Sequence, residues 1–203
     1  PYPFRDALTR DSPLGNLWKF PDMVVVDWEG GEPADQLLNL DPETLALKSG
    51  LGIPPYRIQS VTLRLVPNLE LFREEFFQAL SVSSWCQGGE LFYAGPIEDE
   101  ALADALRQLS NRFGIGITTF GLTAEMLDEL PGPEHILNAQ PRETEALMER
   151  FDVRRIASPR LKDHLDWASL DAIRSDNEEV RRLFRWLTEC IETEQVRPFE
   201  RER

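Results

Sequence analysis

The sequence is short of the residues that usually build metal or redox centres. Among 203 residues there are only two cysteines, Cys86 and Cys190, and two histidines, His135 and His164. The histidines lie far apart and the four residues match no zinc spacing, so we expect no zinc cluster. Two cysteines also cannot make the disulfide framework of a small secreted domain, and nothing marks secretion. We therefore expect a cytoplasmic protein.

Long apolar runs and positive charge are scarce as well. No apolar run approaches the roughly 20 residues that span a bilayer, so we expect no membrane protein. The chain holds 22 Lys and Arg against 36 Asp and Glu, a formal charge of −14. Such a surface repels phosphate, because Lys and Arg supply most non-specific affinity for nucleic acid. Contact with DNA would need a local basic patch, a metal ion or another segment, and the start at Pro1 is typical of a processed chain or fragment.

The chain nevertheless has the composition of a folded domain. Hydrophobic residues make up 41% of it, which is enough for a core. Alternating or β-branched runs predict strands, and apolar stripes at helical spacing predict helices. Their order, β–β–α–β–α–β, favours an α/β (α+β) fold with a mixed central sheet flanked by helices. The strands are expected at 23–26, 58–66, 90–94 and 115–120, and the helices at 69–81 and 98–112.

The last third of the sequence has a different pattern. After Thr123 it is mainly helical, with helices expected at 142–150, 159–174 and 176–194. We therefore predict two parts, an α/β core over residues 1–140 and a helical C-terminal extension over 141–203 that packs on the core.

One constellation of residues indicates a function. Pro21-Asp22 opens the first strand, Thr62-x-Arg64 lies on the second, and Gln78 lies on the following helix. The order and spacing resemble those of the PD-(D/E)xK nuclease superfamily, with the restriction-endonuclease-like domain of HrgA-type proteins as the most similar branch. The resemblance runs to about residue 140 and is carried by PDMVVV at 21–26, SVTLRL at 60–65, FREEFFQALSVSSW at 72–85, NRFGIGITTF at 111–120 and Ile136-Leu137-Asn138-Ala139.

The resemblance implies a restriction-endonuclease-like fold and Mg²⁺-dependent cleavage of phosphodiesters. In such a site Mg²⁺ polarises the phosphate and lowers the pKa of the attacking water. The Asp of the first strand, here Asp22, is a metal ligand. A second acid and a Lys follow on the next strand, two residues apart and therefore on one face. The Lys orients the nucleophile and stabilises the developing charge.

The chain departs from this pattern at both positions of the second strand. Thr62 stands where the family has the second acid, and Thr is a poor ligand for Mg²⁺ because it carries no charge. Arg64 stands where the family has Lys, and an Arg is essentially never a base. We therefore expect a degenerate site, formed by Asp22, Thr62, Arg64 and Gln78, that does not hold Mg²⁺.

Two alternatives would keep the site functional, one by catalysis and one by binding without cleavage. A migrated acid would replace the missing one, with Glu74 on the helix, or Asp27 and Glu29 after the first strand, as candidates. Arg64 would grip a phosphate bidentately without cleaving it. Each acid also has a plain reading as a solvated charge, and Cys86 reads as an ordinary half-buried thiol.

Three hypotheses about function follow. The first is a catalytically degenerate nuclease-like domain with a binding or assembly role in DNA processing or phage defence. The second is an active Mg²⁺-dependent endonuclease with a rearranged site. The third is an acidic protein-interaction module without a nucleic-acid role. A protein partner suits the charge, while DNA would be bound through a missing N-terminal module, or through the modest basic cluster of Arg154, Arg155, Arg160 and Lys162. The oligomeric state is not indicated.

Overall fold

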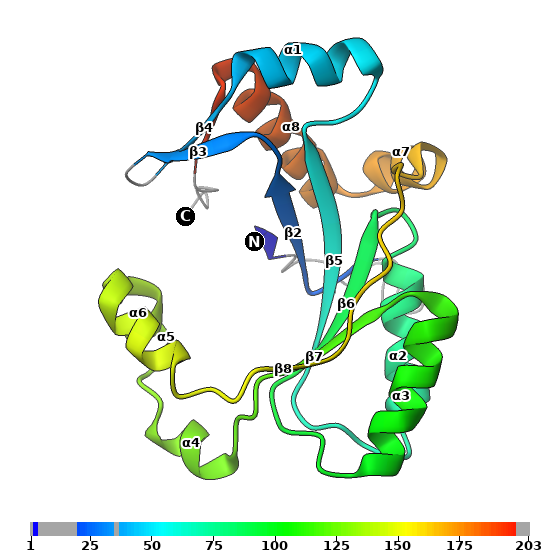
Figure 1. The fold of residues 1–203 in the computed structure, drawn as a ribbon, viewed down its shortest axis with the longest axis vertical. Coiled ribbons are helices and arrows are strands. Elements are labelled where there is room, and N and C mark those ends of the chain that lie inside the picture. Colours follow the sequence, from blue (N-terminus) through cyan, green and yellow to red (C-terminus); the bar gives the residue numbers. More distant parts are fainter. Residues whose placement is uncertain (1, 4–19, 35–36, 198–203) are drawn as a thin grey trace. The chain divides into compact units, whose positions relative to one another are not determined.

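A mixed sheet runs through the computed structural model, which describes residues 2–3, 20–34 and 37–197 (Figure 1). Its six strands follow the order β1-β2-β5-β6-β7-β8. β6 and β7 are parallel, whereas β1 with β2, β2 with β5, and β7 with β8 are antiparallel. The predicted α/β class with a mixed sheet is confirmed. The strands are β1 (Tyr2–Pro3), β2 (Met23–Trp28), β5 (Tyr56–Arg64), β6 (Gly88–Tyr93), β7 (Gly116–Thr119) and β8 (Arg154–Ala157).

A second, smaller sheet was not expected from the sequence. It consists of β3 (Gly31–Ala34), β4 (Leu37–Leu40) and β9 (Gln195–Val196), in that order and antiparallel throughout. Asn39 of β4 pairs with Gln195 of β9. The pairing joins segments more than 150 residues apart, so no local pattern indicates it.

Helices fill most of the connections between the strands. The predicted helices at 69–81 and 98–112 are present as α2 and α3, within a few residues of the expected ends. Residues 141–197 contain α6, α7 and α8, and also β8 and β9, which were not predicted. The helices are α1 (Pro42–Leu51), α2 (Phe72–Val82), α3 (Glu100–Phe113), α4 (Ala124–Glu129), α5 (Pro133–Asn138), α6 (Pro141–Met148), α7 (Trp167–Asp176) and α8 (Glu178–Thr193).

The described residues divide into two compact units, each made of separated segments. The first unit takes its residues from 1–61, 81–88 and 162–203, and the second from 62–80 and 89–161. This division differs from the predicted ranges of 1–140 and 141–203, because residues 141–161 fall in the second unit and the later helices in the first. The organisation into a core over 1–140 and an extension over 141–203 that packs on it stays a prediction.

The first unit is held by an apolar core between its strands and α8. Val24 and Ile58 of β2 and β5 are fully buried, as are Val180 and Leu183 of α8. α8 has a strongly amphipathic pattern, with its apolar residues at helical spacing on one side. The same core contains Phe20, Tyr56, Trp85, Cys86, Leu165, Leu170 and Leu187.

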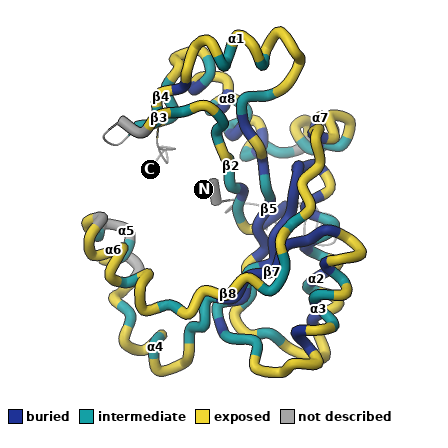
Figure 2. The backbone as a smooth tube through the Cα atoms, viewed as in Figure 1, coloured by how far each residue is buried: buried dark blue, intermediate teal, exposed yellow. Residues whose placement is uncertain are grey.

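The second unit has its own core, which places the candidate site. β6 is buried over most of its length (Figure 2). Leu91 and Tyr93 of β6 pack with Phe76 of α2 and Leu106 of α3, and all four are fully buried. α2 and α3 lie side by side, with the rings of Phe77 and Phe113 in edge contact at 5.4 Å. Since side chains alternate along a strand, Glu90 and Phe92 point to the opposite face of β6.

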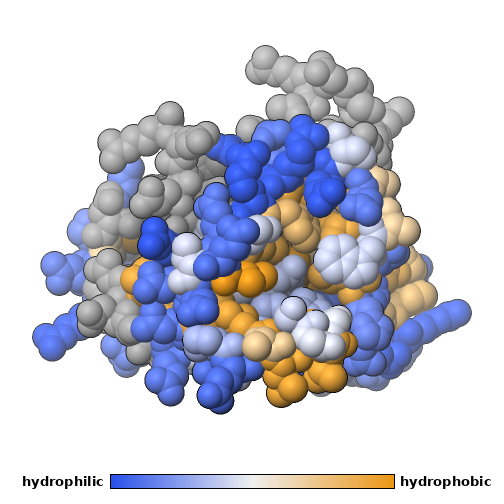
Figure 3. Space-filling model, turned by 90° about the horizontal axis from the view of Figure 1, so that it is seen from above, coloured by the Kyte–Doolittle hydropathy of each residue, from blue (hydrophilic) through white to orange (hydrophobic). Residues whose placement is uncertain are grey.

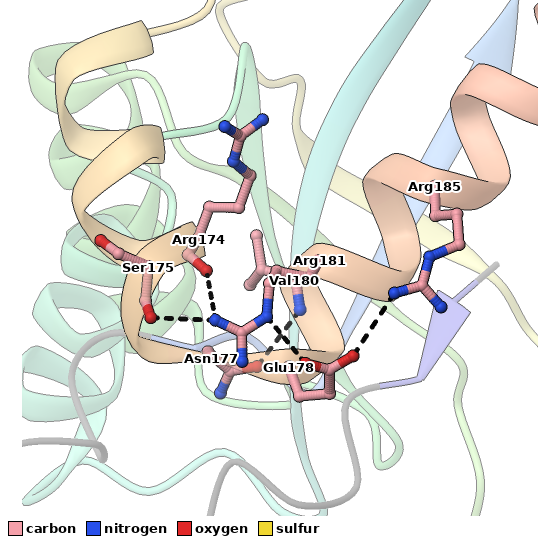
Figure 4. Close-up of polar contacts among 7 residues, drawn as sticks. All are labelled: Arg174, Ser175, Asn177, Glu178, Val180, Arg181 and Arg185. Carbon is pink, nitrogen blue, oxygen red and sulfur yellow. Dashed lines mark hydrogen bonds and ion pairs between the residues drawn. The ribbon is translucent and has the colours of Figure 1, made fainter.

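A network of polar contacts joins α7 to α8 (Figure 4). The side chain of Asn177 accepts a hydrogen bond from the backbone N of Val180 at 3.2 Å and so caps α8. Arg181 donates to the last-turn carbonyls of Arg174 and Ser175, at 3.2 and 2.9 Å. It also pairs with Glu178 at 2.7 Å. Arg181 therefore satisfies the carbonyls that end α7 while it neutralises an acid that begins α8.

Apolar side chains also reach the surface. On the face drawn in Figure 3, hydrophobic residues interrupt a largely hydrophilic surface. Over the described residues as a whole, exposed apolar side chains include Leu47 and Leu51 of α1 in the first unit, and Leu65 and Leu69 in the second. Within the part of the chain that the structure describes, no helix combines the length and apolar character needed to cross a membrane.

Candidate functional site

The first predicted site residue, Asp22, lies just before β2 in the first unit. Its backbone N donates a hydrogen bond to the carbonyl of Val61 at 3.1 Å, which extends the pairing of β2 with β5 by one residue. Its side chain is exposed. The structure therefore places Asp22 immediately before the first residue of β2. Its role as a metal ligand stays a prediction.

Thr62 and Arg64 lie at the end of β5, where the chain enters the second unit. They are two residues apart in one strand and so share a face. Thr62 is only 3% exposed, whereas the side chain of Arg64 keeps 22% of its surface exposed. Thr62 is therefore a buried hydroxyl, and Arg64 is a half-buried guanidinium on the same face of the strand.

The guanidinium of Arg64 is held by side chains of α2. Its Nη2 donates to Oε1 of Gln78 at 2.5 Å, and its Nη1 to the carbonyl of Leu63 at 2.6 Å. Its Nε lies 3.8 Å from Oε1 of Glu75. The hydroxyl of Tyr93, from β6, donates to the other oxygen of Glu75 at 2.8 Å. We call Arg64, Glu75, Gln78 and Tyr93 the Arg64 cluster.

The Arg64 cluster is partly to fully buried and has no net charge. Tyr93 is fully buried, and the side chain of Glu75 is 14% exposed. Burial raises the pKa of Tyr93, and the negative charge of Glu75 raises it further. Tyr93 therefore keeps its proton over the whole physiological range and donates a hydrogen bond to Glu75. Arg64 and Glu75 cancel one another's charge, so the cluster has no net charge of its own.

The structure brings Arg64 and Gln78 together but not Glu74. Glu74 is exposed on α2, and the acid that faces Arg64 is its neighbour Glu75. Glu75 lies three residues before Gln78. Residues three apart share a helix face just as residues four apart do, so the sequence spacing does not favour Glu74 over Glu75. Choosing between adjacent acids requires the orientation of α2, which the buried residues Phe72, Phe76 and Ala79 fix.

The other two candidate acids lie at the far end of β2. Asp27 is exposed. Glu29 pairs with Lys48 of α1 and with Arg57 of β5, the latter at 2.6 Å. The hydrogen bond from Lys48 is the main cause of the lowered pKa of the Glu29 carboxyl. Glu29 is therefore an ion-pair partner of two cations in the first unit.

One buried acid was missed in the sequence. Glu90 of β6 is 8% exposed, and its Oε1 lies 3.7 Å from Nη2 of Arg155. Its Oε2 and the hydroxyl of the buried Thr118 have no hydrogen-bond partner among the described residues. Burial raises the pKa of Glu90, and Arg155 opposes that effect. A charged residue within the apolar run of 90–94 was the available signal.

Cysteine and metal chemistry find little support in the geometry. Cys86 is fully buried, not half-buried as predicted, because it lies within the core of the first unit. Its burial raises the pKa of the thiol, which keeps it in the unreactive form. Among the described residues, no three His, Cys, Asp or Glu side chains gather closely enough to hold a metal ion.

Comparison with known proteins adds no relative to this description. No family model, no curated protein and no solved structure matches the chain. The functional argument therefore rests on the residues and on their geometry.

Proposed function

We propose that the chain is a catalytically degenerate restriction-endonuclease-like domain that acts by binding a partner. The observation that carries the proposal is the Arg64 cluster. A lysine at this position of a nuclease has to reach the attacking water or the phosphate. Arg64 instead donates to Gln78 and Leu63 and faces Glu75.

The chemistry of the two substituted positions supports the same proposal. Arg64 keeps a positive charge but cannot accept a proton from water. Thr62 offers a neutral, buried hydroxyl where Mg²⁺ prefers a carboxylate oxygen. In this proposal Asp22 alone remains of the metal-binding set, and a single exposed carboxylate binds Mg²⁺ weakly because the ion gives up its water reluctantly.

The charge of the chain favours a basic protein as the partner. At −14 its average field attracts cations and repels phosphate, and complementary charge speeds association between proteins. In this proposal any DNA-binding step in DNA processing or phage defence belongs to a separate module, and this domain supplies assembly.

An active nuclease with a rearranged site is the second candidate, and Glu75 is the observation that favours it. Glu75 is an acid borne by the helix next to the motif strand, and it faces Arg64 at 3.8 Å. Its two oxygens are directed at Arg64 and Tyr93, so a metal ion would have to displace one of these contacts. This requirement makes it the weaker candidate.

Metal titration and cleavage assays separate the two candidates. Mn²⁺ is titrated into the purified chain by calorimetry, and single- and double-stranded DNA and RNA are incubated with the protein and Mg²⁺ or Mn²⁺. Asp22→Ala is the test variant, and Glu43→Ala, at an exposed acid of α1 that belongs to neither candidate site, is the matched control. We expect no cleavage and no Mn²⁺ binding that depends on Asp22 below about 1 mM. Cleavage that is lost in Asp22→Ala but kept in Glu43→Ala would overturn the proposal.

A further inference from the structure

A polar groove lies in the second unit at the end of α3. It has a volume of about 460 Å³ and is bounded by the last turns of α3 and by the residues from Ile156 to Arg160. Its nine lining residues include two arginines, two serines and one asparagine, and none is acidic. The groove is thus lined only by cationic and neutral residues, although the chain has 36 acidic ones.

We propose that this groove is a binding site for a phosphate group. Arg107 approaches it from α3, and Arg160 from the segment after β8. Guanidinium groups bind phosphate through paired, charge-assisted hydrogen bonds. The hydroxyls of Ser110 and Ser158 and the amide of Asn111 provide neutral donors around the same space.

Arg160 is held in position by the end of α3. Its backbone N donates to the carbonyl of Gly114 at 2.8 Å, and its Nη2 donates to the carbonyl of Asn111 at 3.0 Å. Gly114 ends the helix with φ 84°, and a Cβ there would lie 3.0 Å from the Cβ of Arg160. A glycine is thus needed for Arg160 to come this close, and the arginine is ordered before any ligand arrives.

The same contacts reduce the main electrostatic objection to an anion at this place. The C-terminal end of a helix carries partial negative charge on its last carbonyls. Here Gly114 donates to the carbonyl of Ser110 at 2.7 Å, while Arg160 covers that of Asn111. The negative end of α3 is therefore partly neutralised by the groove's own donors.

Arg107 is available to an incoming anion. It pairs with Asp104, one turn earlier on α3, at 2.6 Å, and both side chains are well exposed, at 43% and 62%. Exposed ion pairs of this kind are weak because water screens them. A doubly charged phosphate competes with one carboxylate for the same guanidinium.

The lining also restricts the part of the ligand that is recognised. It contains no aromatic residue, so it offers no platform on which a base would stack. The recognised chemistry is the phosphate itself, whether on a small phosphorylated molecule or in a nucleic-acid backbone. This inference does not depend on the proposed function, because none of the Arg64 cluster lines the groove.

The test is a titration of the full chain with inorganic pyrophosphate at low salt, followed by two-dimensional amide NMR. We expect saturable shifts confined to residues 107–116 and 156–160, with a millimolar dissociation constant. Arg107→Ala and Ser158→Ala should each weaken binding, the former about tenfold. Arg160→Lys keeps the charge but loses the paired geometry, and should also weaken it. Arg112→Ala is the matched control on the same helix, since Arg112 does not line the groove.

The outcomes separate the idea from its alternatives. The absence of saturable shifts up to about 10 mM would overturn it, as would equal binding by Arg107→Ala and the unaltered chain. Amide spectra of each variant establish that it is folded. A second titration with a short single-stranded oligonucleotide separates the sources. Tighter binding than pyrophosphate, with the same residues shifted, assigns the groove to a nucleic-acid backbone. Weaker binding assigns it to a small phosphorylated ligand.

Discussion

Replacing Glu75 by Ala should destabilise the protein, whereas the same change at Glu74 should not. The two glutamates are adjacent on α2, but only Glu75 accepts the hydrogen bond of the buried Tyr93 and faces Arg64. Glu74 is exposed. Since the residue type and the helix are the same, the small gain in helix propensity from Glu to Ala is the same in both variants.

The expected size follows from the contacts that are lost. A hydrogen bond to a charged group contributes about 1.5–3 kcal/mol, and its loss leaves the hydroxyl of Tyr93 buried without an acceptor. The pair with Arg64 adds less than about 1 kcal/mol, because its atoms are 3.8 Å apart and partly exposed. We expect Glu75→Ala to lower the free energy of unfolding by about 2–3 kcal/mol, and Glu74→Ala to change it by less than about 0.5 kcal/mol.

Urea unfolding followed by circular dichroism measures both values. For a chain of this size, 2–3 kcal/mol corresponds to a fall in Tm of about 4–12 °C. Glu75→Gln should recover part of the loss, because the amide oxygen can still accept from Tyr93. Equal effects of the two Ala variants would refute the placement of Glu75, and a Glu75→Ala variant as stable as the parent would refute the energetic argument.

Four further predictions concern other parts of the fold. Because the pKa of Glu29 is lowered in the folded state, Glu29 stabilises that state at pH values above its ordinary pKa. This contribution is lost as the pH falls through the pKa of the folded state. Glu29→Gln should therefore flatten the fall in unfolding free energy on acidification. Glu90 has the opposite sign, since its raised pKa costs stability as pH rises, so Glu90→Gln should be more stable than the parent at pH 7 in urea unfolding, with a difference that shrinks below its ordinary pKa. A Cβ at Gly116 would lie 2.7 Å from Pro159, so Gly116→Ala should cost about 1–3 kcal/mol, whereas Gly50→Ala, with nothing within 4 Å, should stabilise α1 by up to about 1 kcal/mol in thermal unfolding. Arg181→Ala should lower the free energy of unfolding by about 1–2 kcal/mol, as measured by chemical denaturation, because two carbonyls at the end of α7 lose this donor and Glu178 keeps only its pair with Arg185.

Local patterns predicted much of the main sheet and its neighbouring helices. The alternation in 58–66 and the apolar stripe in 69–81 arise because one side of each segment is buried. The structure has a strand, β5, and a helix, α2, at these places. β3, β4 and β9 were missed because their pairing depends on the meeting of Asn39 and Gln195 across most of the chain. β8 was missed because RRIA is polar and only half-buried, as suits the last strand of the sheet order.

The candidate site was predicted in outline only. The resemblance paired Arg64 with the helix of Gln78, and the structure joins those side chains. It did not distinguish Glu74 from Glu75, because that choice depends on how α2 is rotated about its axis. It also overlooked Glu90, whose importance comes from burial beside Thr118 and Arg155 on two other strands. The sequence alone does not show which side chains of other strands lie beside Glu90.

The division of the first unit into three chain segments has a consequence for synthesis on the ribosome. Its core combines Val24 and Ile58 of the early strands with Leu165, Leu170 and Val180. The core is therefore complete only when the last fifth of the chain has been made. The residues of the second unit, by contrast, have all been made by residue 161. Contacts between distant segments form slowly, because the loop between them must close first. In the nascent chain, Val24 and Ile58 therefore cannot pack against α8 until α8 has left the exit tunnel.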